Sequence, residues 1–341
     1  MSATRNNYLD FLRGIAILLV VVGHCIQFGS GSAYLKSGLY FANPLFKFIY
    51  SFHMPLFMLI SGYLGWFSIS KKTHKDFVID KCKGILIPLI SWHTLFQGLQ
   101  ILTNPSSISQ EVFFWSYFHT LWFLRALICC YIFVLLGHKF FNDHLLFYIT
   151  ICILMLFVPN KITPDVFVFT IPYFIIGYLF NKYQSINRVS RSLLNPLAYG
   201  MIGLFFLLFL HFYKDNYYAY VSKTYLFNGK YSLFFMIFVN LYRNLTAILG
   251  CIFMLLTTKY LSKFLARSKT NLFFTTIGQV SLCIYIINHY VNELVLLNLP
   301  INKLSYLNVL IESVVIICFA YFCSQLLKKN RLLRILFLGG R

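Results

Sequence analysis

The first apolar stretch of the chain carries an arginine and a histidine where a membrane span normally excludes charge. Arg13 and His24 are eleven residues apart. On a helix this spacing places the two side chains about 20° apart around the axis and roughly 16 Å apart along it. One face of one helix therefore carries a guanidinium near one end and an imidazole near the other. Ionisable groups inside a bilayer are costly, so the default interpretation is a functional site facing the interior of a helix bundle.

A simpler explanation exists for Arg13 than for His24. Arg13 can snorkel toward the cytoplasmic surface, or pair with Asp10, which lies three residues earlier on the same helix face. His24 lies too deep for either explanation, and we favour a functional role for it. Imidazole is suited to accept a proton from a weak nucleophile, or to act as a nucleophile itself. His24 is the first candidate catalytic residue, with Arg13 and Asp10 beside it.

The composition is that of an all-α polytopic membrane protein. The chain is 59% apolar and 11% charged, with a mean hydropathy of +0.72, whereas soluble domains are about 25% charged. No loop is long enough for a separate domain, so we expect a single domain over residues 1–341. The net charge of +20 does not indicate nucleic acid, because the basic residues form short clusters between the apolar stretches. Such clusters set the topology of a membrane protein.

The pattern predicts a bundle of about ten transmembrane helices. Lys and Arg clusters follow the second, sixth, eighth and tenth stretches, and residues 103–118 contain neither residue type. This alternation places both termini in the cytoplasm. The expected helices lie at about 8–28, 44–68, 84–102, 119–137, 145–159, 165–181, 196–212, 231–257, 272–296 and 305–327.

With this topology, polar groups from separate helices share one depth. His53, Arg125 and His289 fall in the outer third of their helices, as His24 does. His119 lies at the same end of the fourth helix and is interpreted as interfacial. A single histidine in a membrane helix is often only a packing residue that makes a hydrogen bond. For His53 and His289 the structural and functional interpretations both stay open.

The ninth stretch has a polar face, and the eighth has a buried arginine. The face has three- and four-residue spacing, which places its members on one side of a helix. Its members are Gly278, Ser281, Tyr285, Asn288 with His289, and Asn292. Arg243, near the middle of the eighth stretch, either hydrogen-bonds non-helical backbone or pairs with Glu312. The nine cysteines show no metal-ligand spacing, and we predict no metal site.

Five motifs in this order together resemble the integral-membrane acyltransferase-3 family. They are Leu9–Gly14 with His24, Ser51–Tyr63, Ile85–Pro88, Leu121–Leu124 and Ile277–His289. Residues 52–57, Phe-His-Met-Pro-Leu-Phe, look most like the fucose 4-O-acetylase branch. Each motif alone is weak, and the ordered set is specific.

The resemblance implies a membrane O-acetyltransferase of the cell inner membrane with acetyl-CoA as its donor substrate. Arg13 and His24 match the family's arginine–histidine motif. The family often has an arginine where this chain has Gly84, so the donor phosphates are assigned to Lys81 and Lys83, with Trp122 on the donor side. A lysine offers phosphate a point charge rather than a bidentate fork.

The expected reaction moves acetyl from acetyl-CoA to a sugar hydroxyl, with no permanently bound cofactor. The partners are membrane lipid, acetyl-CoA and a glycan or lipid-linked glycan, from O-antigen, capsule or exopolysaccharide. Five residues are assigned to the acceptor or oxyanion side: His53, Arg125, Ser281, Tyr285 and His289. The alternative is a transporter or flippase for a lipid-linked sugar, because buried His and Arg also suit a proton relay. Against it, the sequence shows no internal repeat and no matched pair of broken helices.

Overall fold

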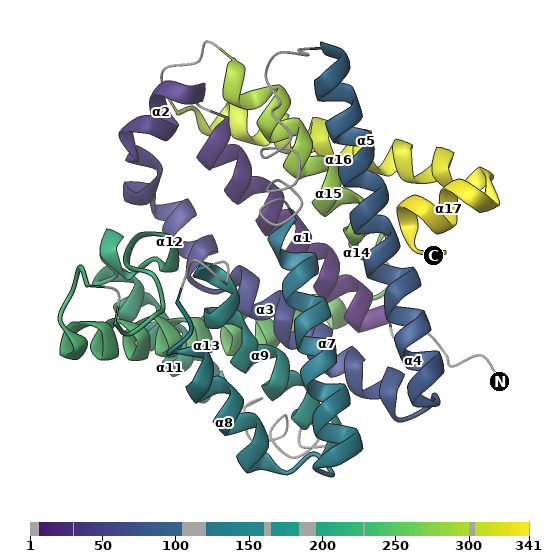
Figure 1. Cartoon of the computed structure of the whole chain (residues 1–341). Coiled ribbons are helices and arrows are strands. Elements are labelled where there is room, and N and C mark those ends of the chain that lie inside the picture. The colour runs from purple at the N-terminus through teal and green to yellow at the C-terminus, as the bar shows by residue number, and fades with distance from the viewer. Residues whose placement is uncertain are drawn as a thin grey trace.

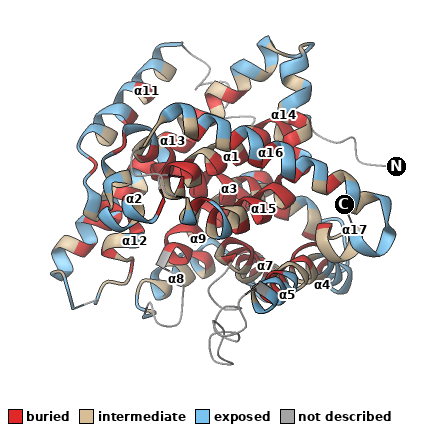
Figure 2. Ribbon diagram, turned by 90° about the horizontal axis from the view of Figure 1, so that it is seen from above, coloured by how far each residue is buried: buried red, intermediate tan, exposed pale blue. Residues whose placement is uncertain are grey.

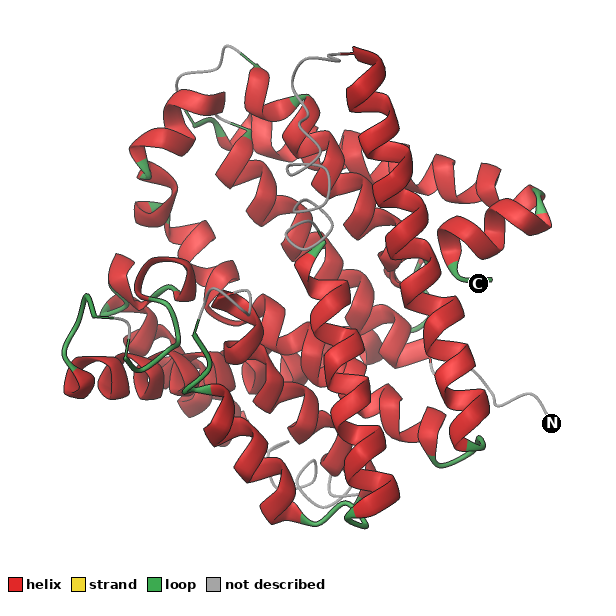
Figure 3. Ribbon diagram, viewed as in Figure 1, coloured by secondary structure: helices red, strands yellow, loops and turns green. Residues whose placement is uncertain are grey.

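The computed structural model describes residues 7–29, 31–103, 121–159, 165–183, 196–227, 229–299 and 304–340. Within these residues the regular structure is helical throughout (Figure 3). The longer helices are α1 (Asn7–Phe28), α3 (Pro44–Ile69), α5 (Ile87–Thr103), α7 (Trp122–Phe140), α8 (Leu145–Met155), α9 (Asp165–Lys182), α11 (Pro196–His211), α13 (Leu233–Phe264), α14 (Lys269–Gln279), α15 (Ser281–Leu294) and α16 (Tyr306–Lys329). The shorter ones are α2 (Gly31–Ser37), η1 (Leu39–Ala42), α4 (His74–Lys81), the π-helix η2 (Cys82–Leu86), η4 (Asp215–Tyr217), α12 (Ala219–Ser222), η5 (Leu296–Asn298) and α17 (Arg331–Leu338).

The all-helical, multi-pass character expected from the sequence is confirmed. Six helices in the described part are long and apolar enough to cross a membrane, and the bent pair α14–α15 makes up to seven. Three more apolar helices, α8, α9 and α11, are shorter than a full span. Helices therefore occur where the sequence predicts them, while the number of ten crossings and the cytoplasmic termini stay predictions. His119 lies outside the described residues.

The prediction that residues 272–296 form one continuous helix is wrong. The helix is broken between α14 and α15, whose axes differ by 73°. Val280 at the break has a non-helical backbone conformation. The predicted polar face therefore divides: Gly278 belongs to α14, whereas Ser281 is the first residue of α15. The rest of the face continues along α15, where Tyr285, Asn288 and Asn292 are buried.

Two close helix crossings place the site-bearing helices. A Cβ atom at Gly278 would overlap the backbone carbonyl of Asp10, and one at Gly14 would overlap the carbonyl of Phe274. Here α14 crosses α1 with no side chain between the two backbones. Gly62 of α3 and Gly177 of α9 make a second reciprocal crossing of the same kind. Small residues allow such approaches in membrane bundles, where close packing rather than exclusion from water drives association.

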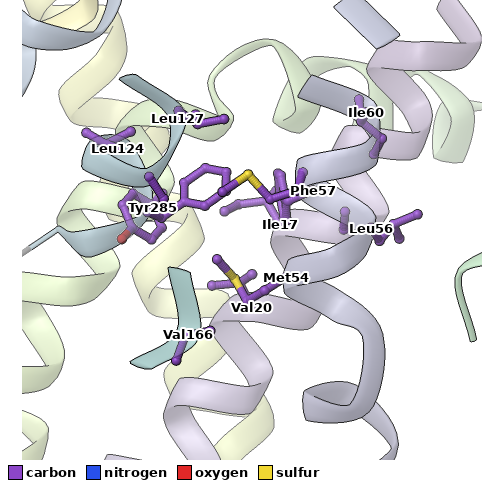
Figure 4. Packing of buried hydrophobic residues seen from close by; sticks show 14 of the residues in the cluster. Ile17, Val20, Met54, Leu56, Phe57, Ile60, Leu124, Leu127, Val166 and Tyr285 are labelled. Carbon is purple, nitrogen blue, oxygen red and sulfur yellow. The ribbon is translucent and has the colours of Figure 1, made fainter. Parts of the chain in front are cut away.

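The core lies around α1, α3, α9 and α15, and the other helices surround it (Figures 1 and 2). In their most apolar windows, 72% of α3 is buried inside the protein but only 33% of α16. Figure 4 shows Ile17 and Val20 of α1 packed with Phe57 of α3 and Tyr285 of α15. The outer helices instead expose large apolar side chains, as expected for surfaces that face lipid.

The buried carboxylate of Asp143 accepts hydrogen bonds from side chains of α7, α8 and α9. Asp143, in the turn between α7 and α8, is 1% exposed. It accepts hydrogen bonds from His138 Nδ1 (2.9 Å), Tyr148 (2.6 Å), Tyr178 (3.0 Å) and Lys182 (3.0 Å). Burial alone would raise the pKa of Asp143. The hydrogen bonds from His138, Tyr148 and Lys182 outweigh burial and hold this pKa below its ordinary value.

This cluster predicts a pH-dependent contribution to stability. Asp143→Asn removes the charge and replaces one acceptor oxygen with an NH2 group, so two of the four donors lose their acceptor, and we expect a cost of about 1–3 kcal/mol at pH 7. A carboxylate with a lowered pKa stabilises the fold above its unfolded pKa of about 4, and the contribution is lost as pH falls through the folded pKa. Thermal unfolding of both proteins in lipid nanodiscs between pH 3 and pH 7 should show the difference shrinking toward low pH. A difference that is constant with pH would contradict this assignment.

Candidate active site

Helices α1 and α15 lie side by side and are joined by polar contacts at two levels. Arg13 donates from Nη2 to Ser281 Oγ at 3.0 Å. Eleven residues farther along α1, His24 Nδ1 lies 2.6 Å from Asn288 Nδ2. Residue numbers rise together on both helices, so α1 and α15 run in the same direction. The predicted arginine–histidine face of α1 therefore meets the predicted polar face of α15.

The imidazole of His24 is half-buried and is oriented by the α15 amides. Asn292 donates to Asn288 Oδ1 at 3.1 Å, which places Asn288 between Asn292 and the ring of His24. The nitrogen and oxygen of a side-chain amide occupy interchangeable positions, so the His24 contact fits two ring tautomers. When Asn288 offers its oxygen, His24 Nδ1 donates and Nε2 keeps a lone pair. Asn288 thus controls the tautomer, and hence the proton-accepting atom, of His24.

Arg13 is held by a carboxylate as well as by Ser281. Asp10 Oδ1 lies 3.7 Å from Arg13 Nη1, and the Asp10 side chain is buried. The three-residue pair expected from the sequence is therefore present. One-fifth of the surface of the Arg13 side chain is exposed. Arg13 is thus fixed in direction yet accessible to an anionic group.

His53 and His289, which the sequence places at the same depth as His24, also lie near it. His53 and His289 are both close enough to act electrostatically on the His24 ring. His289 Nε2 lies 3.5 Å from the carboxylate of Glu293, one turn along α15. On the other side of Tyr50, His53 is almost completely buried and donates from Nδ1 to the carbonyl of Ile49 at 2.9 Å.

Arg125 of α7 and Tyr285 of α15 lie close enough to each other to interact electrostatically. Arg125 Nε and Nη2 are buried without a hydrogen-bond partner in the described part of the chain. Arg125 lies within electrostatic reach of Tyr285 and of His93, a buried residue of α5. His93 was not predicted from the sequence, although the rule that ionisable groups inside a span are unusual applies to it as well. The ring of Tyr285 packs against Phe123 with centroids 5.5 Å apart.

The donor-side residues do not form one cluster: Lys81 lies near Tyr131 at the other end of the bundle, whereas Trp122 packs against Phe123 near Tyr285. Lys81 Nζ lies 4.3 Å from the ring centroid of Tyr131 and 3.7 Å from Asp80. Lys83, inside the π-helix η2, is exposed. Trp122 begins α7, nine residues before Tyr131, which is roughly 14 Å along a helix. The two lysines therefore share one end of the bundle, with Trp122 far from the Tyr131 ring that Lys81 contacts.

The ordered motifs, the α1–α15 polar contacts and the helical bundle agree with a comparison against known families. A family model described as an acyltransferase domain, of acyltransferase type 3, matches residues 6–329. The chain belongs to the acyltransferase-3 family. It is a member of a family of acyltransferase enzymes, as its motifs predict.

Two curated relatives carry the same name. A nodulation protein NolL of Sinorhizobium fredii is 31% identical over 228 residues, which cover 63% of this chain and 61% of the relative. A nodulation protein NolL of Mesorhizobium japonicum is 32% identical over 187 residues, covering 52% of this chain and 49% of the relative. The matched segments thus span 49% and 61% of the lengths of these relatives, less than two thirds of either. No solved structure matches the chain.

Proposed function

We propose that this protein is a multi-pass O-acetyltransferase of the cell inner membrane. It moves an acetyl group from cytoplasmic acetyl-CoA to a sugar hydroxyl of a cell-surface polysaccharide or its lipid-linked precursor. The single observation that carries the proposal is the pair of contacts Arg13–Ser281 and His24–Asn288. These contacts hold the two groups of the arginine–histidine motif on one side of α1, against one helix, within a family of acyltransferases.

In this proposal His24 is the general base. Nε2 takes the proton of the sugar hydroxyl as its oxygen attacks the thioester carbonyl, and a tetrahedral oxyanion forms. The C–S bond then breaks, and the imidazolium returns the proton to the CoA sulfur. For this role the side-chain amides of Asn288 and Asn292 both take their flipped orientation: Asn288 then accepts from Nδ1 of His24 and donates to Asn292, and Nε2 is free to accept. An acetyl-His24 intermediate uses the same lone pair on Nε2.

Arg125 is the best-supported oxyanion donor among the three candidates. Ser281 already accepts a hydrogen bond from Arg13, and the Tyr285 ring is packed among apolar side chains. Arg125 instead has two buried N–H groups without a partner in the described part of the chain. A preorganised cationic donor that awaits a developing negative charge is what an oxyanion site needs.

The function is tested with the purified protein in proteoliposomes. These are supplied with radiolabelled acetyl-CoA and with glycan isolated from the surface of the cells that naturally produce the protein. Label that moves to glycan, at a rate proportional to the amount of protein, is the expected result. Glycan that crosses the bilayer without label would instead identify a flippase. The broken helix α14–α15 is the feature that such a transporter would share, since discontinuous helices form many transporter sites.

The lysines Lys81 and Lys83 are proposed to bind the phosphates of the donor. The double variant Lys81→Gln/Lys83→Gln is expected to raise the KM for acetyl-CoA about tenfold, since two solvent-accessible charge contacts supply up to about 1 kcal/mol each. The turnover number should change less, because contacts far from the reacting carbon bind ground and transition states alike.

Lys71→Gln/Lys75→Gln is the matched control for this measurement. It removes the same charge from exposed positions in the same basic segment. If both double variants leave the donor KM unchanged in correctly oriented protein, Lys81 and Lys83 only set topology.

A further inference from the structure

Helix α17 has no part in the reaction proposed above. It follows the long span α16 after a single residue, Asn330, and packs against α5 and α16 at the edge of the bundle (Figures 1 and 2). The side chain of Asn330 caps the helix by accepting hydrogen bonds from the backbone N–H groups of Leu332 and Leu333. A short amphipathic helix in such a position is typical of the interface between a bilayer and water.

The sequence of α17 divides the helix into a basic side and an apolar side. Arg331 and Arg334 are three residues apart, which places them on one side. Leu332, Leu333 and Leu336 fall on the opposite side. Leu332 is 63% exposed and Leu333 is 38% exposed, so the protein leaves much of this apolar side uncovered. In a chain with membrane spans, lipid acyl chains cover such a surface.

The turn from α16 into α17 carries a concentrated positive charge. Four basic residues fall within seven positions, namely Lys328, Lys329, Arg331 and Arg334, and no Asp or Glu occurs after Glu312. None of the four forms an ion pair within the part of the chain that the structure describes. Lys329 and Arg331 are exposed, and Arg334 Nε is buried without a hydrogen-bond partner among the described residues. Uncompensated cations beside an apolar surface favour an anionic lipid as the partner.

The end of α17 packs against α5 and against the π-helix η2, which carries Lys83. Trp92 of α5 donates from Nε1 to the carbonyl of Phe337 at 2.9 Å, and the two rings pack edge to face with centroids 5.0 Å apart. The chain then turns at Gly339, where φ is 66°, a conformation that favours glycine. A Cβ atom at Gly339 would lie only 2.7 Å from the Cα atom of Gly84. A partner that holds α17 therefore also acts on η2.

We propose that α17 and the end of α16 bind the headgroups of anionic phospholipids. Lys329 and Arg331 contact the phosphate of a lipid such as phosphatidylglycerol, while Leu332 and Leu333 lie among the acyl chains. The exposed leucines next to the cations favour a lipid over the phosphates of acetyl-CoA, because a soluble donor would leave both leucines uncovered. Since α17 packs on η2, bound lipid also holds η2 in place.

Lipid binding is measured on the full chain, independently of acetyl transfer. Native mass spectrometry of the detergent-solubilised protein compares binding of phosphatidylglycerol with binding of phosphatidylcholine, whose headgroup has a phosphate but no net charge. Lys329→Gln/Arg331→Gln is expected to weaken the tightest phosphatidylglycerol site about tenfold or more, since each basic residue at a lipid surface contributes roughly a factor of five. Binding of phosphatidylcholine should not change, and added salt should weaken binding of phosphatidylglycerol.

Hydrogen exchange in nanodiscs gives the location of the bound lipid. The amides of α17 and of η2 should exchange more slowly in discs that contain phosphatidylglycerol than in discs of phosphatidylcholine alone. Lys329→Gln/Arg331→Gln should abolish this difference, because the anionic headgroup then has no cationic partner at the start of α17.

Two double variants serve as controls. Lys329→Arg/Arg331→Lys keeps both charges and should keep the binding, and Lys71→Gln/Lys75→Gln removes the same charge from exposed positions near the start of α4 and should keep it too. Equal phosphatidylglycerol binding by the wild type and Lys329→Gln/Arg331→Gln, at the same unfolding temperature, would overturn the lipid surface. An equal loss of binding in Lys71→Gln/Lys75→Gln would also overturn it, since net charge alone would then explain the effect. If acetyl-CoA slows exchange in α17 in phosphatidylcholine discs and Lys329→Gln/Arg331→Gln abolishes the slowing, the basic turn binds the donor and the lipid assignment is wrong.

Discussion

His24→Ala is expected to lower acetyl transfer by about 10²- to 10⁴-fold, the contribution of a positioned general acid–base group. The nearest other imidazoles do not replace it: His53 is turned toward the carbonyl of Ile49, and His289 lies by Glu293. The variant should still fold, because His24 is only half-buried and its partner Asn288 keeps the contact with Asn292. Initial rates with labelled acetyl-CoA, normalised to folded protein, measure the effect.

His211→Ala is the matched control for this variant. His211 lies at the exposed end of α11, so its loss removes the same group from a position outside the proposed site. Wild-type turnover by a well-folded His24→Ala protein would falsify the general-base assignment and equally the acetyl-His24 alternative.

Gly278→Ala should be the most damaging small substitution in the α14–α15 region. A Cβ at this position overlaps the backbone carbonyl of Asp10, which cannot rotate away as a flexible side chain would. Helix α14 must therefore move away from α1, and Ser281, three residues later, should lose its hydrogen bond with Arg13. We expect a destabilisation of about 1–3 kcal/mol or more, typical of an overpacked contact, together with loss of acetyl transfer. Thermal unfolding and initial rates of the same preparation measure the two effects.

Gly98→Ala is the corresponding control, because no atom of the described residues lies within 4 Å of a Cβ built at Gly98 in α5. Alanine favours a helix over glycine by about 1 kcal/mol, so this variant should be neutral or slightly more stable. Equal behaviour of Gly278→Ala and Gly98→Ala would show that α14 does not need its close approach to α1.

The positions of the helices could be predicted because each depends on local hydropathy alone. The break at Val280 could not, since neither proline nor a charged residue marks it within the apolar stretch. It depends on the crossing of α14 with α1, a contact between residues far apart in the sequence. The conformation of residues 215–224 was missed for a similar reason, because it depends on hydrogen bonds from Arg243 and Asn240, which follow these residues in the chain.

The candidate site was predictable to the extent that charge inside a span is unusual by itself. That rule indicated Arg13 and His24, and the periodicity of the ninth stretch indicated Ser281 and Asn288. Pairing each residue with its partner needed the relative rotation and direction of α1 and α15, which no local pattern contains. The donor side was predicted least well, since basic residues that set topology and those that bind phosphate look alike in a sequence.

The way residues 215–224 are held against α13 has a consequence for which of their side chains can change. Arg243 and Asn240 bond to the main-chain carbonyls of Lys223 and Thr224, which every amino acid supplies. The backbone at Lys223 and Thr224 is therefore held independently of these side chains, whereas Ser222 is restricted because its hydroxyl also accepts a hydrogen bond from Arg243. Sequence change at Lys223 is thus expected to leave the course of this segment and the α1–α15 contacts unchanged.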